Sequence, residues 1–324
     1  MEDAELLGGT AVCAVRKDSG DDPDVTNGIL VRASVSVSDI PGIRIDGGKG
    51  VGRVTKPGLK QSVGEAAINP GPKGMIISAV TDAMDESGRT ENLLVVISVP
   101  GGEEIAARTF NPRLGIEGGI SILGTSGIVE PMSEEALIDS IRLEIRQKRA
   151  LGETRLILTP GNYGTDFLKE TFGTDESRVI KCSNYIGLSL DAAAEAGFKE
   201  VLLVGHVGKL IKLAGGIMNT HSREADGRAE LMAACVLRAG ADADLAREMF
   251  NCVTTDEMLR ILKEKGLLER VMKEAAERIG FYLNARVRGQ FEIGSVVFSD
   301  LYGVLCTTGC AGRWLSEQAG EKRT

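Results

Sequence analysis

The stretch 200-EVLLVGHVGKLIKLAGGIMNTHSREADGRAE-230 decides how the chain folds and where chemistry is expected. It opens with an apolar run, Val201–Val204, that has the length and composition of a buried parallel strand. The run ends at 205-GHVGK-209, which is typical of a strand-to-helix turn. Both histidines of the chain, His206 and His221, lie in this stretch. In open α/β sheets, ligands bind where the carboxyl ends of strands meet such turns, so we expect a functional site here.

Strands and helices alternate on both sides of this stretch. The expected strands are 154–159, 178–182, 200–205, 291–299 and 303–306. The expected helices are 133–149, 164–172, 188–197, 223–239, 242–250, 255–265 and 268–285. This alternation is typical of a parallel, doubly wound sheet with helices on its faces.

The first third of the chain has a different pattern. The expected strands there are 11–16, 29–37, 93–99 and 104–108, with one helix at 73–86. A change of character near Pro112–Gly118 predicts two domains, an α+β N-terminal domain over residues 1–115 and a Rossmann-like α/β domain over residues 116–324. The expected fold class is therefore α/β and α+β.

Composition excludes several classes of protein. The formal net charge of −8 argues against general binding to nucleic acid or to an anionic membrane surface. No apolar run is long enough to span a bilayer and the acidic start Met1–Glu5 is the reverse of a signal peptide, so a cytoplasmic location is expected. Of the six cysteines only Cys306 and Cys310 are close in the sequence, and no second pair accompanies them, so no metal site is expected. The oligomeric state stays open, a homo-oligomer included.

Three glycine-containing loops are expected at the carboxyl ends of strands, at 124–127, 159–164 and 205–209. Because crossover connections are right-handed, the loops should lie on one edge of the sheet. Small residues let a ligand approach the backbone and helix N-termini favour negative charge, so a nucleotide or adenosyl ligand is expected. The candidate contacts are Gly124, Thr125, Ser126, Gly127, Thr159, Gly161, Tyr163, Gly164, Gly205 and Gly208. No G-x-G-x-x-G fingerprint follows a strand, which disfavours an NAD-dependent oxidoreductase.

Two polar groups of residues have both a structural and a functional interpretation. His206 and His221 could cap turns, or could act with Asn219 as acid–base groups or polar contacts to a substrate. The glycine-rich segment 46–76 carries scattered cations that could bind an anionic ligand or could simply face solvent. Ser222 beside His221 does not make a catalytic triad, because adjacent side chains point apart.

Taken together, the motifs resemble those of the cobalt-precorrin-5B (C1)-methyltransferase family of anaerobic cobalamin biosynthesis. The matching stretches, in family order, are 18-DSGDDPDVTNG-28, 50-GVGRVTKPGL-59, 68-INPGPKGMI-76, 118-GGISILGTSGIVEPMS-133, 159-TPGNYG-164 and 202-LLVGHVGKLIKLAGGIMNTHSREADGR-228. The resemblance implies transfer of a methyl group from S-adenosylmethionine to carbon 1 of a ring-contracted, cobalt-containing tetrapyrrole. It also implies a two-part architecture, and cobalt that belongs only to the substrate.

The resemblance assigns roles to the candidate residues. The three loops would hold the adenosyl ligand, and the carboxylates of the tetrapyrrole would bind Lys49, Arg53, Lys56, Lys209 and Arg223. The catalytic candidates are His206, Asn219 and His221. One departure is that the N-terminal Gly-Tyr-Thr-Thr-Gly-Thr-Cys-Ala motif usual in the family does not occur in this sequence. The alternative expectation is therefore a catalytically inactive corrinoid-binding or scaffold protein of the same pathway.

Overall fold

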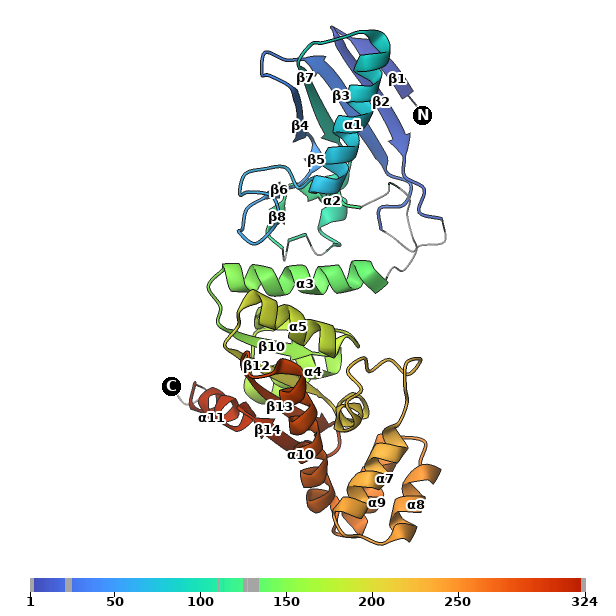
Figure 1. Cartoon of the computed structure of the whole chain (residues 1–324), viewed down its shortest axis with the longest axis vertical. Coiled ribbons are helices and arrows are strands. Elements are labelled where there is room, and N and C mark those ends of the chain that lie inside the picture. Colours follow the sequence, from blue (N-terminus) through green and yellow to red (C-terminus); the bar gives the residue numbers. More distant parts are fainter. Residues whose placement is uncertain are drawn as a thin grey trace. The chain divides into compact units, whose positions relative to one another are not determined.

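The computed structural model describes residues 3–20, 25–109, 111, 112, 114–124, 127 and 134–321 (Figure 1). The chain divides into two compact units, Met1–Leu137 and Ile138–Thr324. Both units combine helices with β-sheet, which confirms the α/β part of the predicted fold class. The domain boundary expected after residue 115 stays a prediction, and the division by compactness falls after Leu137.

The first unit is built on a five-stranded sheet of order β1-β2-β3-β7-β4. These strands are β1 (Asp3–Leu7), β2 (Thr10–Arg16), β3 (Leu30–Val37), β7 (Leu93–Ser98) and β4 (Ile43–Gly47). Strand β4 runs parallel to β7 and the other neighbours are antiparallel. Helix α1 (Pro70–Ser87) crosses one face of this sheet, where its Ile76 and Val80 join an apolar cluster with Val35 and Val95 (Figure 1). Alternation along β3 places such side chains on one face only.

Glycines allow four short strands of this unit to approach one another closely. Strand β5 (Gly50–Val51) pairs in parallel with β9 (Gly119–Ile120), and β6 (Arg53–Val54) pairs antiparallel with β8 (Ile116–Glu117). A Cβ on Gly119 would lie 2.3 Å from the Gly50 carbonyl oxygen, so only glycine fits there. Residues 119–120 fall within the predicted second domain, 116–324, but they form a strand that pairs within the first unit.

The strand expected at 104–108 is wrong, because this segment contains the helix α2 (Gly102–Ala106). Gly101 turns the chain out of β7 with a φ of +82°, and a Cβ on Gly102 would lie 2.2 Å from the Gly50 oxygen. Glu103 and Glu104 lie in the first turn of α2, where the helix dipole favours acids. A short apolar run such as 105-IAA-107 does not distinguish helix from strand.

The second unit is built on a five-stranded sheet of order β11-β10-β12-β13-β14. These strands are β11 (Val179–Lys181), β10 (Arg155–Thr159), β12 (Glu200–His206), β13 (Glu292–Ser299) and β14 (Gly303–Gly309). The first four are parallel and β14 is antiparallel. From β10 the chain goes first to β11 on one side and then to β12 on the other. The strand order therefore reverses between β10 and β12, which is where ligands bind in sheets of this kind.

Helices cover both faces of this sheet. They are α3 (Glu134–Ala150), α4 (Asn162–Phe172), α5 (Ile186–Ala196), α6 (Val207–Leu210), α7 (Arg228–Arg238), α8 (Ala243–Asn251), α9 (Thr255–Glu264), α10 (Leu268–Val287) and α11 (Ala311–Glu321), with 3-10 segments η1 (Glu176–Arg178) and η2 (Ile211–Gly215). Leu203 of β12 faces the larger core, with α5 and α10. Its neighbours Leu202 and Val204 face the opposite core, with Leu168 of α4 and Trp314 of α11. Because both faces of β12 are buried, its sequence is a continuous apolar run.

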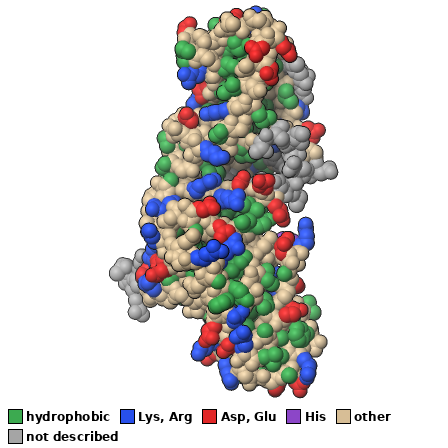
Figure 2. Space-filling view, in the orientation of Figure 1, with side chains coloured by type: hydrophobic (Ala, Val, Ile, Leu, Met, Phe, Trp, Pro, Cys, Tyr) green, Lys and Arg blue, Asp and Glu red, His purple; other side chains and the backbone are tan. Residues whose placement is uncertain are grey.

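No helix in the described ranges is both long and apolar enough to cross a membrane. Basic and acidic side chains are interspersed over the face drawn in Figure 2, without a broad patch of one sign.

Candidate functional site

Two loops meet at the point where the strand order of the second unit reverses. One follows β10 and leads through Pro160 and Gly161 into α4, and the other follows β12 at His206 and leads into α6. The Nζ of Lys209 donates to the carbonyl oxygen of Pro160 at 3.0 Å and so ties the loops together. Burial is the main cause that lowers the pKa of Lys209. Lys209, expected to bind substrate, is thus engaged by the protein.

His206 caps the short helix α6. Its Nδ1 accepts a hydrogen bond from the Gly208 N–H at 3.1 Å, so the neutral imidazole carries its proton on Nε2. Nε2 lies 3.8 Å from Oδ1 of Asp256 in the first turn of α9. That oxygen is buried and accepts no hydrogen bond from any residue the structure describes. The ring packs edge-on to Phe298, with centroids 5.8 Å apart, and lies 6.2 Å from the Tyr163 ring.

The glycines of these loops differ in what surrounds them. A Cβ on Gly164 would lie 2.8 Å from the Val204 oxygen, and one on Gly205 would lie 2.9 Å from Leu210. Both glycines therefore let protein pack against protein. Gly161 has no atom within 4 Å of the position of a Cβ, so a ligand could approach it. The buried Thr159 hydroxyl lies 3.4 Å from that of Thr165 and also belongs to the interior.

A third segment, residues 219–226, lies beside the turn that follows β11. Asn219 forms an antiparallel bridge with Tyr185, and the Thr220 N–H donates to the Asn184 carbonyl at 2.9 Å. Within the segment, the His221 Nδ1 accepts from the Arg223 N–H at 3.0 Å, and the Asn219 Oδ1 accepts from the His221 N–H at 3.1 Å. Because β11 is the neighbour of β10, the predicted Asn219, His221 and Arg223 belong to the same sheet edge as His206.

Five of the site residues predicted from the sequence belong to the described part of the first unit. Lys49 and Lys56 are exposed, whereas Arg53 is paired with Asp46 at 3.0 Å. The hydrogen bond from Arg53 lowers the pKa of the Asp46 carboxyl. Gly124 approaches Gly71 near the start of α1, and Gly127 faces Met75. Thr125 and Ser126 lie outside the described residues. That these residues share one pocket with the loops of the second unit stays a prediction.

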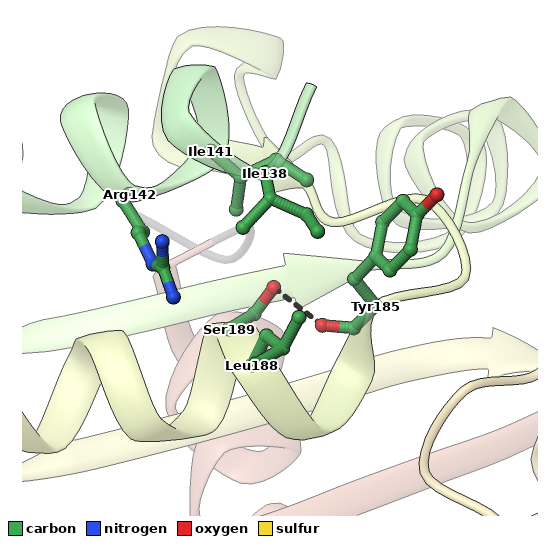
Figure 3. A pocket seen from close by; sticks show the side chains of 6 residues that line it. All are labelled: Ile138, Ile141, Arg142, Tyr185, Leu188 and Ser189. Atoms are coloured by element: carbon green, nitrogen blue, oxygen red, sulfur yellow. Dashed lines mark hydrogen bonds between the residues drawn. The ribbon is translucent and has the colours of Figure 1, made fainter. Parts of the chain in front are cut away.

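Two hollows of the second unit lie outside this sheet edge. A crevice between α3 and α5 is lined by side chains that face one another, with Tyr185 at one end and Arg142 at the other (Figure 3). It has essentially no volume open to a water molecule. A shallow cleft of about 470 Å³ lies at the C-terminal ends of α5 and α10 and is lined by Asp191, Ala194, Glu195, Ala285, Arg286, Arg288 and Gln290. Arg286 is paired there with Asp191. Among the described residues, no three His, Cys, Asp or Glu side chains are grouped to hold a metal ion.

Comparison with known proteins identifies relatives along most of the chain. A family model described as CbiD matches residues 1–131, and one described as CbiD, C-terminal domain, matches residues 219–309. Curated relatives named cobalt-precorrin-5B C(1)-methyltransferase include one from Ruminiclostridium cellulolyticum, 51% identical over 89% of this chain and 75% of the relative. Another, from Alkaliphilus metalliredigens, is 44% identical over 97% of this chain and 82% of the relative.

A third relative of that name, from Thermoanaerobacter sp., is 44% identical over 94% of this chain and 83% of its own length. A crystal structure of a cobalamin biosynthesis protein (cbiD) from Archaeoglobus fulgidus matches with 29% identity over 69% of this chain and 70% of that one, with a TM-score of 0.33.

Proposed function

The chain belongs to the CbiD family, and on this premise we propose that it is a cobalt-precorrin-5B C(1)-methyltransferase whose methyl donor is S-adenosylmethionine. The observation that carries the proposal is the likeness to three curated enzymes of that name, at 44% to 51% identity over at least 89% of the chain. Each match also spans at least 75% of the relative. The proposal therefore assigns to this chain the reaction for which these relatives are named.

We propose that the second unit is Rossmann-like and binds the adenosyl ligand between the loops at 159–164 and 205–209. Three features support this position. The strand order reverses between β10 and β12, Gly161 leaves the backbone open, and the Tyr163 ring is 69% exposed beside His206. An exposed aromatic face can stack on a purine base. Gly164 and Gly205 would contribute indirectly, by letting α4 and α6 pack close to the sheet.

We propose that the carboxylates of the tetrapyrrole bind cations that the protein itself leaves available. Arg223, Lys49 and Lys56 are exposed, whereas Arg53 and Lys209 already have partners within the protein. Point charges and guanidinium groups suit carboxylates. The substrate brings its own cobalt, and the described residues offer no cluster of ligands for a resident metal.

S-adenosylmethionine supplies an electrophilic methyl group, and the residues of this chain have to position the two reactants. In the displacement, the carbon–carbon bond forms as the carbon–sulfur bond breaks, and the electron pair of that bond remains on sulfur. Alignment alone can supply much of such a rate. His206 uses Nδ1 to cap α6 and directs Nε2 towards Asp256. These contacts support a role in ordering the loop rather than in transferring a proton.

Calorimetric titration with S-adenosylmethionine and, separately, with NADH tests the proposal. Saturable binding of S-adenosylmethionine alone is the expected result. Binding of NADH alone would contradict the proposal and favour an oxidoreductase. Binding of the tetrapyrrole without S-adenosylmethionine would favour the second candidate, a corrinoid-binding scaffold. A cytoplasmic location remains a prediction, and the oligomeric state stays open.

A further inference from the structure

Lys212 is a buried cation that was not among the candidate residues predicted from the sequence. Its side chain is only 3% exposed. Nζ donates to the Ala225 carbonyl at 2.7 Å and to the Thr220 carbonyl at 3.2 Å, and it lies 3.9 Å from Oδ1 of Asp226. Desolvation is the main cause that lowers the pKa of Lys212. A buried charge is costly unless it is paired and hydrogen-bonded, and all three contacts of this one are made with a single loop.

That loop is the segment 219–226, which has no helix or strand of its own. Its first residues are held by the turn after β11, through the bridge from Asn219 to Tyr185. Its last residues are held by the Lys212 ammonium and by Arg228 at the start of α7, which donates hydrogen bonds to Asp226 at 2.5 and 2.9 Å. Both ends of the loop are therefore fixed by contacts with the rest of the unit, and His221 and Arg223 lie between them.

Arg223 is the cation that this arrangement presents to solvent. Its side chain is exposed, and no carboxylate of the described residues forms an ion pair with it. Arg228, five residues further on, is neutralised by Asp226. The backbone N–H of Arg223 donates to His221, which fixes the turn from which the guanidinium projects. The loop therefore offers one unpaired guanidinium on an ordered backbone.

We propose that Lys212 is a positioning residue that holds the loop 219–226 in place so that Arg223 binds a carboxylate of the tetrapyrrole. This inference rests on the proposed function, because it takes the anionic macrocycle as the substrate. If the loop is already ordered in the free protein, substrate binding does not bear the entropy cost of ordering it, and the affinity is higher. A planar guanidinium matches a carboxylate with two parallel hydrogen bonds, provided that its backbone is held. Lys212 acts through Arg223 and does not itself touch the substrate.

Steady-state kinetics of Lys212→Met, Arg223→Met and the double variant test the coupling. We expect each single variant to raise the KM for the tetrapyrrole about tenfold, with a smaller effect on kcat and an unchanged Kd for S-adenosylhomocysteine. In the Lys212→Met background, Arg223→Met should have no further effect, because the loop no longer presents the guanidinium. Lys263→Met, which removes an exposed lysine of α9, is the matched control and should leave KM unchanged.

The two histidines provide a readout that does not depend on activity. His221 lies in the loop and His206 lies at the end of β12, so the imidazole NMR signals of the folded chain report on each place separately. Lys212→Met should shift or broaden the His221 signals and leave those of His206 in place. Lys212→Gln keeps a buried N–H donor without the charge, so it should fold where Lys212→Met does not and should show a smaller shift.

Unchanged His221 signals together with an unchanged KM in a folded Lys212 variant would overturn the inference. Additive effects of Lys212→Met and Arg223→Met on KM would also overturn it, since the two residues would then act independently. A wild-type chain that transfers no methyl group to the tetrapyrrole would instead contradict the proposed function. The NMR result would still show whether Lys212 holds the loop.

Discussion

The Nζ of Lys209 lies 3.0 Å from the carbonyl oxygen of Pro160 and joins two loops that are 49 residues apart in the sequence. The hydrogen bond connects the loops that follow the neighbouring strands β10 and β12, between which we propose that the adenosyl ligand binds. Hydrogen bonds from charged groups contribute about 1.5–3 kcal/mol, so this contact is strong enough to set the geometry of the site.

Lys209→Met is expected to weaken binding of S-adenosylhomocysteine about tenfold, because the loops lose their connection. Isothermal titration calorimetry measures the effect. Lys199→Met removes an exposed lysine just before the start of β12 and serves as the control, with no change in Kd expected. Equal affinity of wild type and Lys209→Met would show that the ligand does not need the tie.

Gly161 and Gly164 form a matched pair for separating ligand contact from packing. In Gly164→Ala the new Cβ would meet the Val204 oxygen at 2.8 Å and Thr159 at 2.9 Å, so we expect a loss of about 1–3 kcal/mol of unfolding free energy. In Gly161→Ala the space is open and the backbone is extended, so stability should be unchanged. The affinity for S-adenosylhomocysteine should nevertheless fall in Gly161→Ala, because the new Cβ would occupy space that the ligand needs to approach the backbone.

Thermal unfolding and calorimetric titration of both variants measure these two effects. Full cofactor affinity in Gly161→Ala would argue against a ligand at the loop after β10. A stable Gly164→Ala would show that α4 can move away from β12 at little cost.

His206 can be tested with a substitution that keeps its cap. Asparagine is a favourable N-cap residue, so His206→Asn should retain the stability of the α6 turn, whereas His206→Ala should lose about 1 kcal/mol. If His206 orders the loop, as its contacts with Gly208 and Asp256 suggest, kcat of His206→Asn should stay within about tenfold of wild type. A fall of about a hundredfold or more would assign the imidazole a direct catalytic role.

Because of Cys182, the unfolding free energy of the second unit should depend on pH in the alkaline range. Burial raises the pKa of this thiol from 9.0 to about 12 in the folded chain. Between those values the unfolded chain releases the proton while the folded chain keeps it, so the folded state binds more protons and stability falls as pH rises. The contribution is fully present below pH 9 and is lost by about 1.4 kcal/mol per pH unit above it.

Urea unfolding at several pH values between 8.5 and 10.5 measures this dependence in wild type and Cys182→Ala. The variant should be less stable than wild type at pH 8.5 because of the cavity, but its stability should fall less steeply as the pH rises. Parallel curves for the two proteins would contradict the role of Cys182.

The sequence predicts the second unit well because its elements have strong periods. The apolar runs of β10 and β12 alternate with helical segments, which favoured buried strands. The long amphipathic helices α9 and α10 begin within a residue or two of their expected positions. In the first unit, short strands such as β5 and β9 were not predicted. Their two-residue lengths carry no period, and glycine contacts between distant segments hold them together.

At the candidate site too, contacts between segments that are distant in the sequence could not be predicted. His206, Asn219, His221 and Arg223 could be proposed as candidates from the sequence because they follow one predicted strand. Asp256 was missed because it comes from a helix fifty residues away that packs against the end of β12. Lys212 was missed because a lysine in an apolar run reads as an exposed residue, whereas here its ammonium is buried among carbonyls. The helix expected from residue 223 begins at Arg228, since Lys212 holds the preceding residues as a loop.

Methyl transfer itself is the most direct test of the central claim. The purified chain would be incubated with S-adenosylmethionine that carries a ¹³C-methyl group and with cobalt-precorrin-5B, and the product would be followed by mass spectrometry and ¹³C NMR. We expect one labelled methyl group per macrocycle, attached to carbon 1, and release of S-adenosylhomocysteine in equal amount. An unlabelled macrocycle after incubation with a chain that binds both reactants would contradict it and would favour the scaffold.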